Sequence, residues 1–153
     1  MKYIVCEKPG KFSMREKTLP QRDQNEALLK VNKVGICGTD IHAFAGNQPF
    51  FSYPRILGHE LSCSVLEIGE NEKKISNGDN VIVMPYISCK HCIACNNGKT
   101  NCCTNINVLG VHKDGGMQEK ISAPIDILLP AKDLTFNQMV IVEPLSIGAH
   151  AIK

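Results

Sequence analysis

Five cysteines lie within residues 89–103, CKHCIACNNGKTNCC, and this cluster constrains the fold more than any other feature of the chain. The whole chain has 153 residues and eight cysteines. Its opening residues, MKYIVCEKPGKF, carry Glu7 inside their apolar run, which is not the pattern of a secretory signal peptide. We therefore expect a cytoplasmic protein, where reducing conditions disfavour disulfides and a cysteine cluster points to metal binding or catalysis.

Four of these cysteines have the spacing of a closed metal site, C-x2-C-x2-C-x7-C, formed by Cys89, Cys92, Cys95 and Cys103. Four thiolates on one loop can surround Zn²⁺ at about 2.3 Å each and leave no open position. Such a site stabilises a loop that has no core of its own, so we predict a structural zinc here. Free thiols are the alternative, the closing gap is unusual for an iron–sulfur cluster, and Cys102 could replace Cys103.

The charge balance excludes two classes of partner. The formal net charge is only +2, and no basic run is longer than a pair. We therefore expect no nucleic-acid or membrane-surface partner. No apolar stretch approaches the ~20 residues that span a bilayer.

Short apolar segments separated by turn residues predict a mainly β fold. Strands are expected in MKYIVCE, EALLKVNKVGICG, ELSCSVLEIG, DNVIVMPY, GGMQEKISAP and DILLPA. TDIHAFAG predicts a short helix with Thr39 or Asp40 as its cap and Gly46 as its end. The final segment, TFNQMVIVEPLSIGAHAIK, predicts another helix with Pro144 near its start. The pattern as a whole indicates a β-barrel with a few short helices and a cysteine-rich lobe.

A second set of candidate metal ligands is spread over three motifs. GICGTDIH contains Cys37, ILGHE contains His59 and Glu60, and VEPL contains Glu143. A thiolate, an imidazole and a carboxylate suit a catalytic Zn²⁺ that keeps one position for water or substrate. Spacing alone does not unite residues so far apart, and each has an ordinary reading as a packed or surface residue.

Taken together and in this order, the motifs resemble the zinc-containing medium-chain alcohol and polyol dehydrogenases. The matching pieces are GICGTDIH, YPRILGHE, NGDNVIVMP, the four-cysteine spacing, DGGMQE and VEPL, and they cover essentially the whole chain. Glu143 in VEPL is similar to the polyol and threonine dehydrogenase branch, because simple alcohol dehydrogenases tend to carry cysteine there. The run GNQPFFSYPRILGHE is most similar to bacterial sugar-acid dehydrogenases of the L-galactonate 5-dehydrogenase type.

The resemblance implies a ligand set for the catalytic metal. Cys37 and His59 would be zinc ligands, Glu60 a ligand or its exchange partner, and Glu143 a further ligand, directly or through water. With the lobe cysteines this makes two Zn²⁺ per chain.

The resemblance also implies roles for three neighbouring side chains. Asp40 would orient His59 by accepting its free N–H. Thr39 would receive the substrate's proton, and His42 would pass it to solvent.

The implied activity is oxidation of a secondary alcohol, in a polyol or a sugar acid such as L-galactonate, with NAD(P) as hydride acceptor. No G-x-G-x-x-G follows a strand, so residues 1–153 are expected to be a GroES-like catalytic domain and a fragment that is inactive alone. We expect a Rossmann domain after residue 153 and a homo-oligomeric full-length enzyme.

Two other functions compete with an enzyme. A stand-alone zinc-binding interaction module would need only the cysteine lobe, and a co-chaperonin-like ring would need neither set of ligands. Within GNQPFFSYP, the aromatic residues Phe50, Phe51 and Tyr53 are candidates both for the mouth of a substrate pocket and for plain packing.

Overall fold

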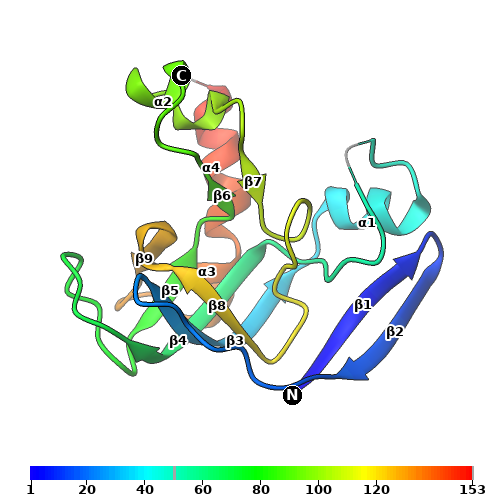
Figure 1. Cartoon of the computed structure of the whole chain (residues 1–153), viewed down its shortest axis with the longest axis horizontal. Helices are drawn as coiled ribbons and strands as arrows, with labels where there is room; N and C mark the ends of the chain where they lie inside the picture. Colours follow the sequence, from blue (N-terminus) through cyan, green and yellow to red (C-terminus); the bar gives the residue numbers. More distant parts are fainter. Residues whose placement is uncertain (50, 153) are drawn as a thin grey trace.

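The computed structural model describes residues 1–49 and 51–152, and its main element is a five-stranded antiparallel sheet (Figure 1). The strands lie in the order β8 (Lys120–Pro124), β3 (Glu26–Gly35), β4 (Glu60–Ile68), β5 (Asn80–Val83) and β9 (Leu128–Pro130). The two outer strands, β8 and β9, are joined only by the short 3-10 turn η2 (Ile125–Ile127), so the edges of the sheet lie near each other. The described residues form no ladder between these edges, and the barrel is open along that side. The mainly β fold is confirmed.

The core forms on one face of this sheet because apolar residues recur at every second position. In β3 the buried pair is Ala27 and Leu29, and in β4 Leu61, Cys63 and Val65 all point into the same cluster. Burial raises the pKa of the Cys63 thiol to about 12, which makes it an inert core residue. This alternation is the signal that predicts β3 and β4 from the sequence.

A separate hairpin begins the chain, with β1 (Lys2–Lys8) paired to β2 (Lys11–Glu16). Gly10, at a φ of 72°, provides the left-handed turn between them. The sequence analysis did not predict β2, because KFSMRE is mostly exposed and lacks a buried alternating face. Its extended form depends on pairing with β1.

The helix α1 (Gly38–Ala45) begins earlier than expected. Its N-cap is Cys37, so the prediction of Thr39 or Asp40 as the cap was wrong. Asp40 lies in the first turn and reaches back, and its Oδ2 accepts a hydrogen bond from the Cys37 N–H at 2.9 Å. The predicted end is confirmed, since Gly46 closes the helix at a φ of 80°.

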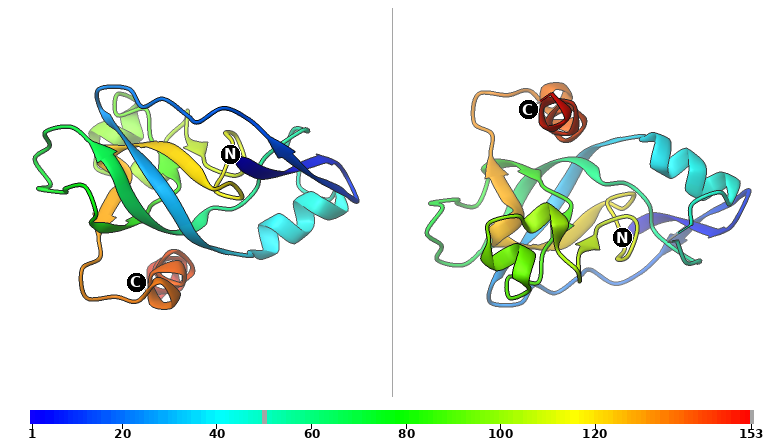
Figure 2. Two further views of the ribbon diagram at one scale, coloured as in Figure 1. Left: turned by 90° about the horizontal axis from the view of Figure 1, so that it is seen from below. Right: turned by 90° about the horizontal axis from the view of Figure 1, so that it is seen from above.

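The lobe and the C-terminal helices flank the sheet. The lobe leaves and re-enters the body through a two-residue ladder of β6 (Tyr86–Ile87) and β7 (Asn107–Val108), and it contains α2 (Ile93–Asn96) and η1 (Thr100–Cys102). The chain ends in α3 (Phe136–Val140) and α4 (Val142–Ala151). Figure 1 shows the lobe and α4 projecting from the same side of the sheet, and the hydrogen bond from Tyr86 on β6 to Glu143 on α4 joins them at their base. Figure 2 shows α4 and the lobe as separate ribbons. Within the described residues, no helix has the length and apolar character needed to cross a membrane.

Candidate metal centres

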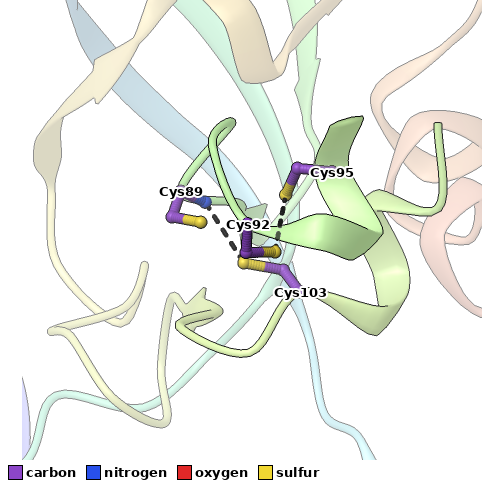
Figure 3. A group of neighbouring side chains, drawn as sticks. All are labelled: Cys89, Cys92, Cys95 and Cys103. Atoms are coloured by element: carbon purple, nitrogen blue, oxygen red, sulfur yellow. Dashed lines mark hydrogen bonds between the residues drawn. The ribbon is translucent and has the colours of Figure 1, made fainter. Parts of the chain in front are cut away.

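The four-cysteine site, formed by Cys89, Cys92, Cys95 and Cys103, brings four sulfur atoms within 4.8 Å of one another (Figure 3). The sulfurs of Cys92 and Cys95 are 3.5 Å apart. A tetrahedral ion with bonds of about 2.3 Å requires sulfur atoms about 3.8 Å apart, so the site fits Zn²⁺ without rearrangement of the chain. Because all four positions are filled by protein sulfur, it is a closed site.

Local backbone features bring the sulfurs inward and lower the pKa of the Cys89 and Cys92 thiols, whereas desolvation is the main cause that raises the pKa of Cys95. Lys90 and Gly98 adopt left-handed φ values of 65° and 72°, which turn the chain tightly between the cysteines. The N–H groups of Cys89 and Asn105 donate to the Cys103 sulfur at 3.2 and 3.4 Å. The backbone N–H of Cys95 is the main cause that lowers the pKa of Cys92 to about 5. This arrangement suits thiolate ligands of a cation.

The structure separates the two candidates for the fourth ligand. Cys103 is 6% exposed and belongs to the group of four sulfurs, whereas Cys102 is exposed and lies outside it. Cys102 is the last residue of η1, and Cys103 is its C-cap. Cys102 therefore supplies a matched control for Cys103.

The Cys37 group, formed by Cys37, His59 and Glu60, is the second set of potential ligands within 4.8 Å of one another. Cys37 caps α1, His59 directly precedes β4, and Glu60 is the first residue of that strand. His59 and Glu60 are buried, at 6% and 8% exposure. The predicted association of residues from GICGTDIH and ILGHE is thus present in the fold.

Charge provides an independent argument that a cation belongs in this group. Asp40, Glu60 and Glu143 are all buried carboxylates. Burial is the main cause that raises the pKa of Glu60; His59 lowers this pKa, and the negative charges of Glu143 and Asp40 raise it further. The ion pairs among the described residues place no lysine or arginine against them; the one partner is His59 beside Asp40. Burial of neighbouring like charges without a lysine or arginine against them is unfavourable, and a divalent cation bound there would relieve it. The Nδ1 atom of His59 is also buried without a hydrogen-bond partner.

Asp40 differs from its expected role. Both of its oxygens accept backbone hydrogen bonds, from the Cys37 N–H at 2.9 Å and from the Gly58 N–H at 3.1 Å. His59 Nδ1 lies 3.8 Å from Asp40 Oδ1, which is longer than a hydrogen bond. In this structure Asp40 fixes the two backbone turns that carry Cys37 and His59 and does not accept the imidazole N–H.

The expected proton path follows α1 outward from the Cys37 group. The Cys37 thiol lies 3.7 Å from the Thr39 hydroxyl, and Thr39 is half-buried. His42 follows one turn later on the helix and is exposed. The two side chains are therefore ordered from the metal ligands toward water.

Glu143 lies beside the Cys37 group but outside the set of atoms within 4.8 Å. It belongs to the first turn of α4, is 4% exposed, and its Oε1 accepts a hydrogen bond from the Tyr86 hydroxyl at 2.6 Å. Burial, followed by this contact, raises the pKa of Tyr86 above its ordinary value, so the hydroxyl keeps its proton and donates. The sequence analysis missed Tyr86, since a tyrosine at the end of an apolar run carries no metal-ligand pattern.

A groove of about 440 Å³ passes Tyr86 between β6–β7 and α4. Its walls are mainly apolar, with Val108 on one side and Ile147 on the other. We call it the Tyr86 groove. It connects the surface to the tyrosine that touches Glu143.

The aromatic candidates for a pocket mouth are packing residues where the structure describes them. Phe51 and Tyr53 make an edge-to-face contact with ring centroids 4.8 Å apart, and both pack against a small core cluster that includes Leu57. The Tyr53 hydroxyl donates to the Ala43 carbonyl. Phe50 lies outside the described residues.

Gly35 determines whether the Glu60 carboxylate can lie in the Cys37 group. The register of β3 and β4 places Gly35 directly opposite Glu60. A Cβ added to Gly35 would overlap Oε2 of Glu60 and lie 2.9 Å from its Cβ. Glycine therefore leaves the space that this carboxylate occupies.

Gly35→Ala is expected to displace Glu60 and weaken metal binding by the Cys37 group by about 10–100-fold, the range seen when the support of a ligand is lost. The measurement is competition between the protein and a chromogenic zinc chelator. Gly38→Ala is the control, because a Cβ at Gly38 meets no atom within 4 Å. Equal zinc affinity in the two variants would show that Glu60 does not need this space.

The family described as "Alcohol dehydrogenase GroES-like domain" matches residues 23–133. The chain belongs to this family. L-galactonate-5-dehydrogenase of Escherichia coli strain K12 is 46% identical over 153 residues, a match that covers 100% of this chain and 45% of the relative.

Two further similar proteins agree with that assignment. L-threonine 3-dehydrogenase of Caldanaerobacter subterraneus subsp. tengcongensis is 35% identical over 141 residues, or 90% of this chain and 41% of the relative. A crystal structure from Escherichia coli CFT073, described as a short chain alcohol dehydrogenase complexed with cofactor NADH, superposes with a TM-score of 0.89 at 38% identity. It covers 97% of this chain and 44% of the other. The GroES-like domain thus spans less than half the length of these relatives.

Proposed function

We propose that this GroES-like domain is the catalytic domain of a longer, cytoplasmic, zinc-dependent oxidoreductase that oxidises a secondary alcohol of a polyol or sugar acid, with NAD(P) as the hydride acceptor. The observation that carries the proposal is the convergence of half-buried Cys37 with buried His59 and Glu60 in one acid-rich group that suits a cation. L-galactonate is the first substrate to test, because the relative with 46% identity carries that name.

The chain's own residues can hold the metal ion and transfer a proton from the substrate to water. Zn²⁺ held by the Cys37 group would supply Lewis-acid polarisation of a substrate oxygen. The Thr39 hydroxyl can accept a proton and donate its own, so it can transfer a proton without holding charge. Imidazole is the side chain best suited to exchange that proton with water near neutral pH, which assigns this step to His42.

His42→Ala is expected to lower kcat of the full-length enzyme most strongly at low pH, because hydroxide can take over the removal of the proton as the pH rises. The loss at low pH should lie toward the lower end of the roughly 10²-fold to 10⁴-fold range of general acid–base catalysis. Steady-state rates between pH 6 and pH 9 test this. The zinc content should stay unchanged, and loss of zinc would contradict the relay role.

A substrate panel tests the proposed function. The complete gene product, supplied with zinc and either NAD or NADP, is assayed for reduced nicotinamide with L-galactonate, sorbitol, L-threonine and ethanol. We expect the highest kcat/KM for the sugar acid or the polyol, and two zinc ions per chain. No turnover of any secondary alcohol, or a clear preference for ethanol, would contradict the proposal.

A longer enzyme would also supply the dinucleotide-binding motif that residues 1–153 do not contain. We propose that a Rossmann NAD(P)-binding domain completes the enzyme, and that residues 1–153 alone bind zinc but transfer no hydride. The relatives, of which this chain covers 41–45%, support that proposal. A stand-alone zinc-binding module is not favoured, because it would have no use for the Cys37 group.

A further inference from the structure

Tyr86 makes a contact with the acid-rich group that no ligand pattern predicts. Its hydroxyl donates to Glu143 Oε1 at 2.6 Å, and among the hydrogen bonds of the described residues it is the donor to that carboxylate. Tyr86 lies on the two-residue strand β6, whereas Glu143 lies on α4. The hydrogen bond therefore links the base of the lobe to the helix on the far side of the Tyr86 groove.

The hydrogen bond from Tyr86 bears on where the Glu143 carboxylate lies relative to the Cys37 group. Glu143 lies in the first turn of α4, which contacts β4, the strand that begins at Glu60. Its oxygens do not join the atoms of the Cys37 group that lie within 4.8 Å of one another. Three protein ligands and an open fourth position are the arrangement of a catalytic zinc site, and four protein ligands are that of a closed one. A shift of Glu143 toward the metal would convert the first arrangement into the second.

A buried carboxylate that loses its hydrogen-bond donor is expected to move toward another partner. Glu143 is 4% exposed, so its carboxylate depends mainly on protein groups for hydrogen bonds. Leaving a buried charged group without its hydrogen bond is unfavourable, and an adjacent divalent cation is the strongest available partner.

We propose that Tyr86 is a positioning residue that holds Glu143 back from the metal, so that the fourth coordination position stays available to substrate. The proposal rests on the proposed metal site and adds to it a restraint on a potential fourth ligand. Tyr86 acts through Glu143, and its removal changes the coordination of the metal before it changes any chemical step.

The test uses the full-length protein with Zn²⁺ in the four-cysteine site and Co²⁺ in the Cys37 group. The visible spectrum of Co²⁺ reports its coordination, and azide is the probe for an open position. In the parent protein we expect azide to change the spectrum. In Tyr86→Phe we expect an altered starting spectrum, slower release of Co²⁺ to a chelator and azide affinity lower by about tenfold or more.

Two further variants separate positioning from general damage. Tyr86→Phe/Glu143→Gln should restore the azide response, because the amide is a poor metal ligand. Tyr53→Phe, which removes a tyrosine hydroxyl bound only to the Ala43 carbonyl, should match the parent. An unchanged azide titration in Tyr86→Phe, or no binding of Co²⁺ in that variant, would overturn the proposal while the metal site itself stands. A parent spectrum that does not depend on Cys37 would overturn the proposed function as well.

Discussion

His59→Ala is expected to remove one of two zinc ions and to lower kcat/KM of the full-length enzyme by about a thousandfold or more with every alcohol. His59 contributes the single imidazole of the Cys37 group, and two remaining ligands do not hold a catalytic zinc firmly. A metal that polarises a substrate oxygen contributes several kcal/mol, and each 1.36 kcal/mol is tenfold in rate. The alanine also leaves three buried carboxylates without a cation, so this region should lose some stability.

The measurements are zinc per chain by elemental analysis and the formation of reduced nicotinamide. His91→Ala is the matched control: His91 lies in the four-cysteine loop but outside both ligand sets, and its ring contacts the Cys89 carbonyl. That variant should keep two zinc ions and most of its activity. Two zinc ions in His59→Ala would show that the second metal, if bound, lies elsewhere.

Cys103→Ser is expected to remove the other zinc ion and to disorder the lobe. Structural zinc sites contribute about 10–16 kcal/mol of apparent binding free energy in small zinc-finger peptides, where binding and folding are one process. The lobe segment has little core of its own, because Cys103 is its one buried ligand and α2 contains no buried residue. Loss of the metal should therefore open this segment while the five-stranded sheet remains folded.

Zinc per chain, the unfolding temperature and limited proteolysis test this result. Cleavage of Cys103→Ser should concentrate within residues 88–106. Cys102→Ser should keep its zinc and resist the protease, because Cys102 is exposed and lies outside the group of sulfurs. The reverse outcome, with zinc lost from Cys102→Ser alone, would make Cys102 the fourth ligand.

The sequence predicts those parts of the fold in which one local rule dominates. β3 and β4 carry alternating apolar residues, and their strand form requires no knowledge of distant partners. The four-cysteine site is similarly local, since its ligands lie within fifteen residues. β2 could not be found in this way, because its exposed residues become a strand only by pairing with β1.

The Cys37 group shows why a site assembled from distant segments is harder to predict. Its ligand types are visible in the sequence, but their proximity depends on the pairing of β3 with β4, which places Gly35, two residues before Cys37, opposite Glu60. The motifs indicate this proximity only through resemblance. The contributions of Gly35 and Tyr86 follow from register and from a contact between separate elements. Neither residue belongs to a zinc-ligand pattern, so their contributions become visible only in the three-dimensional structure.

The paired strands at the base of the lobe have a consequence for variation among such domains. Tyr86–Ile87 and Asn107–Val108 lie side by side, so the chain departs from the body and returns to it at a single place. Lengthening the segment between β6 and β7 raises the entropic free-energy cost of closing this loop only slowly, by about 0.6 kcal/mol for each doubling in length. Insertions and deletions between these anchors should therefore be tolerated far better than changes to the anchors themselves, where one residue, Tyr86, is also hydrogen-bonded to Glu143 beside the Cys37 group.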